Sequence, residues 1–263
     1  MPDLTPTEHS LESDRERARE IAERGLILRT TVGSVVHGLS NPGTDDRDEM
    51  GVCVEPPEYL LGFRRFEHFL FRTQPEGKPS GPGDLDLTVY GLRKYCRLAL
   101  KGSPTTLLPL FVNEEDVITR TPAGEELQAL APAFVARSTG RAFLGYLDAQ
   151  RRGLTGERHA TRTRELSRLH GYDTKYAMHA LRIGYQGLEL LQTGRITLPM
   201  AEPERTALRE VRAGKVPLED VLEHLDRVTL RLEVASKRRD LPAKPDIDAV
   251  DAFVVRTYLG AWG

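Results

Sequence analysis

The chain is poor in cysteine and in aromatic residues, and it has no long apolar run. Its 263 residues include 2 cysteines and 1 tryptophan, and aromatic residues make up 6% of the total. Two cysteines are too few for a disulfide framework or for a zinc site built from cysteine ligands. Because Cys53 and Cys96 both lie in apolar runs, we predict that they are buried thiols in a reducing compartment.

The sequence also lacks the pattern of a membrane protein. No stretch approaches the ~20 consecutive apolar residues that a transmembrane helix needs. Residues 1–19 are polar and charged, without the apolar core of a signal peptide. We therefore expect no membrane partner and a cytoplasmic location.

No single sign of charge dominates the chain. Lys and Arg number 37, Asp and Glu number 39, and the formal net charge is -2. This balance is not typical of proteins that bind nucleic acid through their overall charge, although a local basic face is compatible with it. Hydrophobic residues at 39% and charged residues at 29% predict a packed core rather than a disordered chain.

The pattern of predicted elements changes along the chain. Before residue 122, helical patterns alternate with strand patterns, whereas a series of helical patterns follows Pro122 and strand signals nearly vanish. A length of 263 residues corresponds to one large or two small domains. We predict an α+β fold in which residues 1–121 form a domain with a small sheet and residues 122–263 form an all-helical domain.

Three segments of the first part are predicted strands. Leu26–Val32 and Met50–Val54 are short apolar runs, and Asp84–Tyr90 alternates polar and apolar residues. Residues 58–83 are predicted to form an elaborated loop. In the second part, residues 159–191 show one helical pattern, and Ile196–Leu198 is either an isolated strand or an extended link.

The most informative stretch runs from Gly33 to Asp48. A predicted strand ends at Gly33-Ser34, a helical turn follows, and Asp46 and Asp48 open the next strand. Residues i and i+2 of a strand share a face, so these two carboxylates project together. The same alternation directs the neighbouring Asp45 to the other face.

A third carboxylate comes from the predicted strand at residues 84–90. Asp84 and Asp86 share one face of it, and one of them joins the cluster if this strand pairs beside the strand that starts at Asp48. Carboxylate clusters of this kind suit Mg²⁺ or Mn²⁺. Two such ions ~3.5–4 Å apart clamp an in-line displacement at phosphorus, because one activates the attacking hydroxyl and the other stabilises the leaving pyrophosphate.

The Gly33-Ser34 turn predicts a contact with phosphate. Glycine lets a phosphate approach the backbone, the amide N–H groups of the following turn point at anionic oxygens, and the Ser34 hydroxyl is a further donor. We therefore expect a site for a nucleoside triphosphate and two divalent ions. His37 in the same turn is either a nucleotide contact or a structural histidine.

A stripe of basic residues lies on a predicted helix of the second part. Lys175, His179 and Arg182 are spaced at i, i+4 and i+7 and share one helical face. This cationic stripe either meets the β- and γ-phosphates across a cleft or forms a solvated face. Four arginines precede the stripe and form either a contact for a polynucleotide backbone or an exposed charged run. They are Arg158, Arg162, Arg164 and Arg168.

These motifs resemble a known enzyme superfamily. The pattern Gly33-Ser34…Asp46-Arg47-Asp48 is similar to the Gly-Ser…Asp-x-Asp signature of the DNA polymerase beta superfamily of nucleotidyltransferases. The wider run over residues 33–52 resembles one branch, the bacterial and phage family named for an RNA-repair pathway. Residues 86–111 and 172–182 fit the same branch, although Ser103 stands where that family often has Asn.

The resemblance, which extends over residues 26–199, implies a fold and an activity. The implied fold is a small mixed sheet backed by helices, with a helical domain that closes over the nucleotide. The implied activity is transfer of a nucleoside monophosphate from an NTP such as ATP to an acceptor hydroxyl, with release of pyrophosphate. By this resemblance Asp46 and Asp48 are the shared metal ligands and Asp86 is the third carboxylate. Gly33 and Ser34 hold the triphosphate.

The acceptor that the resemblance implies is an RNA 3′ end, as in RNA repair. Other members of the superfamily modify a protein hydroxyl or a small molecule such as an aminoglycoside, and a fold does not choose among these acceptors. A sensor module that binds nucleotide without catalysis is the non-enzymatic alternative. The presence of all three acids, Asp46, Asp48 and Asp86, argues against it.

Overall fold

The computed structural model describes residues 8–40, 45–74, 78, 81–154 and 164–263. In the first part, helices and strands alternate. They are α1 (Glu8–Arg24), β1 (Leu26–Val32), α2 (Gly33–Val36), β2 (Arg47–Cys53), α3 (Pro57–Leu60), β3 (His68–Arg72), β4 (Leu85–Gly91), α4 (Leu92–Leu100), α5 (Pro104–Leu107), the 3-10 helices η1 (Leu108–Leu110) and η2 (Glu114–Asp116), and β5 (Val117–Arg120).

The second part is helical, as the sequence predicts. Its elements are α6 (Pro122–Ala129), the 3-10 helix η3 (Ala131–Phe134), α7 (Arg137–Leu154), α8 (Arg164–His170), α9 (Thr174–Thr193), α10 (Glu204–Arg212), α11 (Leu218–Ala235) and α12 (Ile247–Trp262). The single helical pattern predicted for residues 159–191 is interrupted, because Gly171 has a φ of +80° and Asp173 caps the start of α9. Ile196–Leu198 is an extended link and not a strand.

The five strands form one mixed sheet in the order β3-β4-β2-β1-β5. β2 and β4 are parallel, and the other neighbours are antiparallel. The predicted α+β class is confirmed, and so are the three predicted strands. β3 and β5 were not predicted, because β3 lies inside the segment interpreted as a loop and β5 has only 4 residues, too few to show a clear period.

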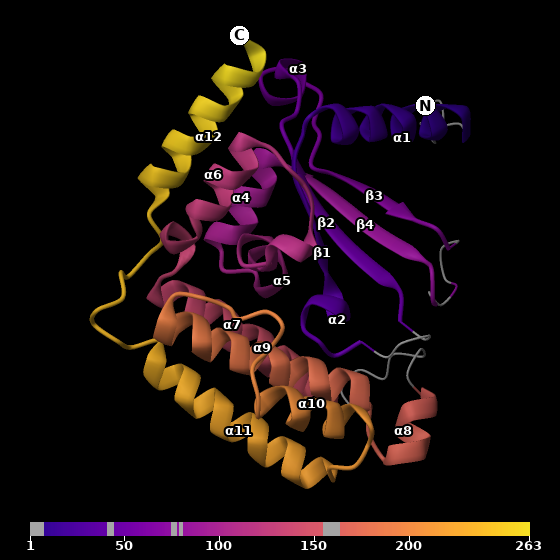
Figure 1. Cartoon of the computed structure of the whole chain (residues 1–263), viewed down its shortest axis with the longest axis vertical. Helices are drawn as coiled ribbons and strands as arrows, with labels where there is room; N and C mark the ends of the chain where they lie inside the picture. Colours follow the sequence, from indigo (N-terminus) through magenta and orange to yellow (C-terminus); the bar gives the residue numbers. More distant parts are fainter. Residues whose placement is uncertain (1–7, 41–44, 75–77, 79–80, 155–163) are drawn as a thin grey trace, which may run out of the picture.

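Strand alternation divides the sheet into two buried faces. On one face, Val52 and Leu28 belong to the main core, and on the other Phe69 and Val89 pack with residues of α1. Figure 1 shows α1 lying across the outer strands of the sheet, while α4 and α6 lie beside its other end. Cys53 and Cys96 are buried free thiols, as predicted, and burial raises the pKa of both.

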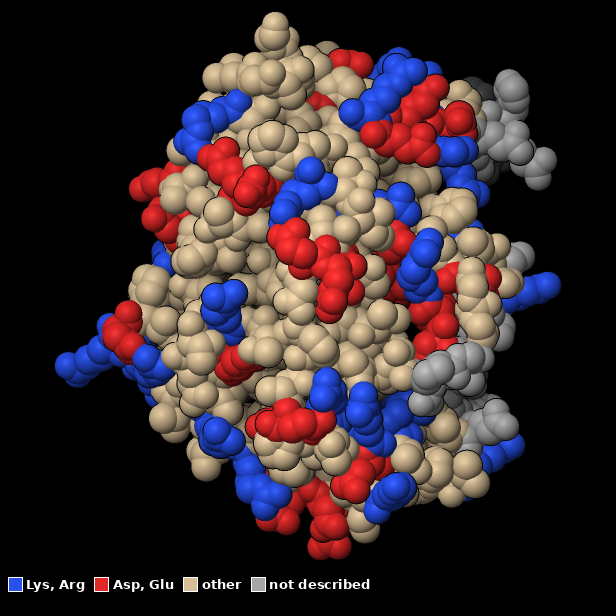
Figure 2. Space-filling view, in the orientation of Figure 1, with Lys and Arg blue, Asp and Glu red and all other residues tan. Residues whose placement is uncertain are grey.

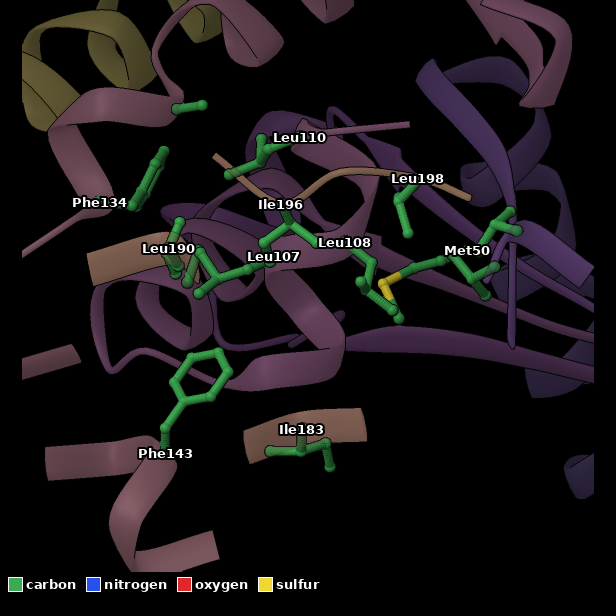
Figure 3. Packing of buried hydrophobic residues seen from close by; sticks show 14 of the residues in the cluster. Met50, Leu107, Leu108, Leu110, Phe134, Phe143, Ile183, Leu190, Ile196 and Leu198 are labelled. Atoms are coloured by element: carbon green, nitrogen blue, oxygen red, sulfur yellow. The ribbon is translucent and has the colours of Figure 1, made fainter. Parts of the chain in front are cut away.

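The main core joins the sheet to the long helices. Figure 3 shows Met50 of β2, Leu107 of α5, Leu108 of η1 and Ile183 of α9 within one packed cluster. α9 lies at the centre of the helical part and contacts α7, α10 and α11. This continuous core fixes α9 against the sheet, and the cleft described below lies between them.

The last helix returns to the first part of the chain. The backbone N–H of Arg93 donates to the Tyr258 hydroxyl at 3.2 Å, and Trp262 Nε1 donates to the carbonyl oxygen of Glu55 at 3.1 Å. The division into domains at residues 121 and 122 stays a prediction. Within the described ranges, we find no helix that is both long enough and apolar enough to cross a membrane.

Candidate active site

Three carboxylates converge at the edge of the sheet where β2 and β4 begin. Asp48 and Asp86 are direct neighbours in the parallel register of these strands, and Asp46 immediately precedes β2. One carboxylate oxygen from each of the three lies within 4.8 Å of the other two. Burial, together with the charges of Asp46 and Asp86, raises the pKa of Asp48 to about 6. A cation bound among these oxygens would offset that repulsion.

Asp84 has a structural role in the turn between β3 and β4. Its carboxylate accepts hydrogen bonds from the Gly81 backbone N–H at 2.8 Å, from Thr73 Oγ1 at 2.8 Å and from Gln74 Nε2 at 2.9 Å. These bonds lower its pKa. The sequence left open whether Asp84 or Asp86 completes the cluster, and in the structure it is Asp86 that lies there.

Arg72 is a neighbour of the cluster that sequence reasoning missed. It lies opposite Asp86 in the antiparallel register of β3 and β4. Its guanidinium forms a two-pronged ion pair with Asp86, with Nε–Oδ1 and Nη2–Oδ2 distances of 2.9 Å each. Such a fork restricts the orientation of the carboxylate. The short apolar run Phe69-Leu70-Phe71 between His68 and Arg72 was the signal by which β3, and thus Arg72, could have been found.

The turn at Gly33 lies directly against the carboxylates. Gly33 has a φ of +73°, and a Cβ atom at this position would lie 2.0 Å from Asp48 Oδ2. Only glycine combines this backbone conformation with so close an approach. Ser34 Oγ donates to Asp45 Oδ2 at 3.1 Å. The prediction that Asp45 faces away is wrong, because β2 begins at Arg47 and strand alternation does not extend back to Asp45.

A cleft of about 590 Å³ opens between this edge of the sheet and α9. All nine residues predicted for the site line it, and Asp45 does too. The nine are Gly33, Ser34, His37, Asp46, Asp48, Asp86, Lys175, His179 and Arg182. Apolar side chains such as Met50, Leu108 and Met178 line the rest. Figure 2 shows charges of both signs over the visible face, with Lys and Arg gathered in its lower half over α10.

His37 is fully buried in the wall of the cleft. Its Nδ1 accepts a hydrogen bond from Gln186 Nε2 at 3.1 Å, so the proton of the neutral ring lies on Nε2. Burial first, then the charge of Arg182, lowers its pKa well below the ordinary value. Nε2 has no hydrogen-bond partner among the described residues. A buried donor without a partner costs roughly 1–3 kcal/mol.

Arg182 is a buried cation held by uncharged partners. Its Nη2 donates to His179 Nδ1 at 2.8 Å, and His179 Nε2 lies 3.4 Å from the Tyr146 hydroxyl. Burial lowers the pKa of Arg182 to about 10 and that of His179 to about 3. The predicted stripe therefore carries two charges and not three, because His179 is neutral at pH 7 and accepts a hydrogen bond from Arg182.

Lys175 is the exposed member of this stripe. It lies one turn before His179 on α9, and its charge, like that of Arg182, partly offsets the rise in the pKa of Asp48. The cleft thus has carboxylates on the sheet side and cations on the helix side. Of the basic run that precedes the stripe, Arg158 and Arg162 lie outside the described residues, and Arg168 is exposed on α8.

Comparison with known proteins gives three similarities. The model of the family described as "RNA repair pathway DNA polymerase beta family" matches residues 9–256. An uncharacterized 38.9 kDa protein from the nrdC-mobD intergenic region of Enterobacteria phage T4 is 33% identical over 101 residues, which are 37% of this chain and 30% of that protein. The matched segment therefore spans less than a third of the phage protein.

The third similarity is to a solved structure. The crystal structure of spectinomycin adenyltransferase AAD(9) from Enterococcus faecialis, with ATP and spectinomycin, aligns with a TM-score of 0.40 and 14% sequence identity. The alignment covers 96% of this chain and 99% of the adenyltransferase chain.

Proposed function

Because the chain belongs to the RNA repair pathway DNA polymerase beta family and is a nucleotidyltransferase, we propose that it transfers a nucleoside monophosphate from an NTP to the hydroxyl at an RNA 3′ end. The observation that carries this proposal is the cleft, in which three carboxylate oxygens lie within 4.8 Å of one another opposite Lys175 and Arg182. The carboxylate cluster suits divalent cations, and the charges of Lys175 and Arg182 suit a triphosphate.

The donor set fits a pair of hard divalent cations. Asp46, Asp48 and Asp86 offer only carboxylate oxygens, which Mg²⁺ and Mn²⁺ prefer, and the repulsion among them favours a positive partner. These three residues would hold two Mg²⁺ or Mn²⁺ ions. When bound, such ions supply neutralisation of phosphate charge and a lower pKa for the attacking hydroxyl.

We propose that residues from both sides of the cleft hold the triphosphate. The backbone at Gly33 and the Ser34 hydroxyl approach it from the sheet side, and Lys175 and Arg182 from α9. His37 lines the cleft beside them, with its Nε2 buried in the wall. Donors held in place before the substrate binds stabilise developing charge without reorganisation, which is the main catalytic contribution expected here.

The reaction is a single displacement at the α-phosphorus. The acceptor oxygen forms a new ester bond to this phosphorus while the bond to the oxygen that bridges the α- and β-phosphates breaks. The electron pair of the broken bond leaves with pyrophosphate. We assign Asp86 as the group that accepts the hydroxyl proton.

The test is incorporation of labelled NTP into RNA by the wild type and by the Asp46→Asn/Asp48→Asn variant. The variant should keep its fold and lose at least about a hundredfold in rate, since it loses two of the three charges that hold the ions. Asp226→Asn, at an exposed position on α11, is the matched control and should retain full activity. Full activity in the double variant would refute the proposal.

The acceptor class is tested separately. Labelled NTPs are incubated with the enzyme and with separated RNA, protein and metabolite fractions, and label is expected in the RNA fraction. Label in the protein fraction alone would refute the RNA acceptor while leaving nucleotidyl transfer intact. The same assay with each of the four NTPs in turn gives the base preference.

A further inference from the structure

The order of the strands places Gly33 and β3 on opposite sides of the carboxylate cluster. An in-line displacement requires the attacking oxygen and the leaving pyrophosphate on opposite sides of the α-phosphorus. Gly33, at the end of β1, lies on the β1 side of Asp48, and β3 lies on the far side of Asp86. If the triphosphate lies toward Gly33, the acceptor approaches over β4 and β3.

The sheet face on that side is open. The register places Arg72 opposite Asp86, Leu70 opposite Thr88 and His68 opposite Tyr90, and directly opposed residues share a face. We call this set of side chains, His68, Leu70, Arg72, Thr88 and Tyr90, the β3–β4 strip. On the same face of β2, Val52 is fully buried, whereas Leu70 is 53% exposed.

The other face of β3 has a different environment. Phe69 and Phe71 pack with residues of α1 there, and β3 forms the outer edge of the sheet beside α1 (Figure 1). The folding of β3 is therefore explained by its buried face. On the strip, His68 and Leu70 are exposed, whereas Tyr90 is half-buried against the main core and Arg72 is paired with Asp86.

The chemistry of the strip suits a single strand of nucleic acid. The rings of His68 and Tyr90 lie with their centroids 6.0 Å apart at one end. Lys94 and Arg97 lie beside this end, because both pair with Glu67, the residue before His68, at 2.7 Å and 3.4 Å. Rings that stack on bases, next to cations that contact phosphates, are the usual elements of single-strand binding.

The segment before β3 adds to this character. Phe63 is completely exposed, and Arg64 and Arg65 beside it are exposed as well. Lys94 and Arg97 pair with Glu67, and the exposed Arg64 and Arg65 precede it by three and two residues, so four cations accompany this one carboxylate although the whole chain has a formal net charge of -2. A polyanion is therefore favoured here over a neutral or basic partner.

We propose that the β3–β4 strip binds the single-stranded 3′ end of the RNA acceptor and delivers its terminal hydroxyl to Asp86. Bases stack against His68 and Tyr90, and backbone phosphates contact Lys94 and Arg97. Leu70 lies between the stacking end and the carboxylate cluster. This inference rests on the proposed function, because it takes the direction of approach from in-line transfer.

The experiment measures binding of a 5′-labelled single-stranded oligoribonucleotide by fluorescence anisotropy, and binding of ATP with Mg²⁺ by calorimetry. Leu70→Asp places a negative charge in the middle of the strip at an exposed position. It should raise the Kd for RNA at least tenfold and leave the Kd for ATP unchanged. Leu230→Asp, at a position that is 63% exposed on α11, is the matched control and should change neither.

A second variant guards against a folding defect in the first. His68→Ala removes one ring from an exposed site and should raise the Kd for RNA at least fivefold, a loss in the range seen for single base-stacking contacts. The inference is wrong if both folded variants bind RNA as tightly as the wild type, or if Leu230→Asp loses as much affinity as Leu70→Asp. It is also wrong if Leu70→Asp blocks labelling of a protein fraction while RNA binding is unchanged.

The two proposals fail in different ways. If the strip variants lose RNA binding but the wild type transfers no nucleotide to RNA, RNA binding by the strip is supported and the proposed function is refuted. If the wild type extends RNA and Leu70→Asp does so with the same KM for RNA, the proposed function is supported and RNA binding by the strip is refuted.

Discussion

Two histidines at the cleft combine burial with neutrality. His179 has its pKa lowered to about 3 by burial, and His37 has its pKa lowered well below the ordinary value of 6.5 for the same reason. In the unfolded chain both rings take up a proton near pH 6.5. Their neutral form in the folded protein therefore contributes stability that is fully present above pH 6.5 and is lost as the pH falls from 6.5 toward 3.

A pH series tests this linkage. His179→Gln keeps an acceptor for Arg182 and removes the titrating ring, so its free energy of unfolding should fall less than that of the wild type between pH 7 and pH 5. The difference should be about 2 kcal/mol. Urea unfolding at the two pH values measures it, with His68→Gln, at an exposed position on β3, as the control. An equal pH dependence in wild type and His179→Gln would contradict the prediction.

Gly33 offers a second test at the residue scale. Gly33→Ala adds a Cβ atom on top of Asp48 Oδ2 and should abolish nucleotide transfer. Gly194→Ala is the matched control, since Gly194 has nearly the same φ, +75°, with no atom within 4 Å of the added Cβ. Both variants should lose about 1–2 kcal/mol of unfolding free energy from the backbone conformation. Activity assays should separate them, with only Gly33→Ala inactive.

Arg182 is the third residue with a measurable role. Arg182→Lys keeps the charge but loses the planar fork that His179 holds. We expect the Kd for ATP to rise about tenfold, since the cation is no longer oriented toward the proposed phosphate position. Tyr146→Phe removes a hydroxyl that contacts His179 and not Arg182 itself. It should therefore raise the Kd for ATP by a smaller factor. An unchanged Kd in Arg182→Lys would show that the arginine does not contact the nucleotide.

At the scale of elements, α9 carries the basic side of the site, and β3 supplies Arg72, which pairs with Asp86. α9 begins at Asp173, whose carboxylate accepts from the Tyr176 backbone N–H at 3.0 Å, and it carries the three residues of the stripe. Local patterning predicted this helix and its face, because a period of 3.6 residues appears in the sequence itself. It did not predict β3, because an edge strand with one buried face has only a few residues that follow the alternation.

The N-terminal cap of α9 can be tested directly. Asp173→Ala should lower the free energy of unfolding by about 1 kcal/mol, and Asp173→Asn should restore most of it, because asparagine caps as well as aspartate does. Urea denaturation of the three proteins measures this. A loss of the same size in Asp173→Asn would mean that the negative charge, and not the cap, supplies the stability.

At the scale of the whole molecule, the cleft exists because one core connects the sheet to the helices. Met50 of β2 and Ile183 of α9 belong to the same buried cluster. The two sides of the site are more than a hundred residues apart in sequence, since Asp48 and Lys175 lie in different parts of the chain. A ligand that bridges the two sides should therefore stabilise the whole fold and not one part of it.

Thermal unfolding with and without ligand tests this coupling. ATP with Mg²⁺ at about a hundred times its Kd should stabilise the protein by about 2.7 kcal/mol, in a single transition. EDTA should remove this stabilisation, and the Asp46→Asn/Asp48→Asn variant should not show it. A ligand-induced shift that persists in EDTA would mean that the nucleotide binds without the proposed metal ions.

The sequence by itself determined the features that depend on neighbouring residues. Gly33, Ser34, Asp46 and Asp48 lie within one short segment, where the two-residue period of a strand and the special conformation of glycine act locally. Only the tertiary structure decided that Asp86 and not Asp84 joins them, that Arg72 pairs with Asp86, and that His179 is neutral. These outcomes depend on which strands pair and on how deeply a side chain is buried, and both are set by contacts between residues that are distant along the chain.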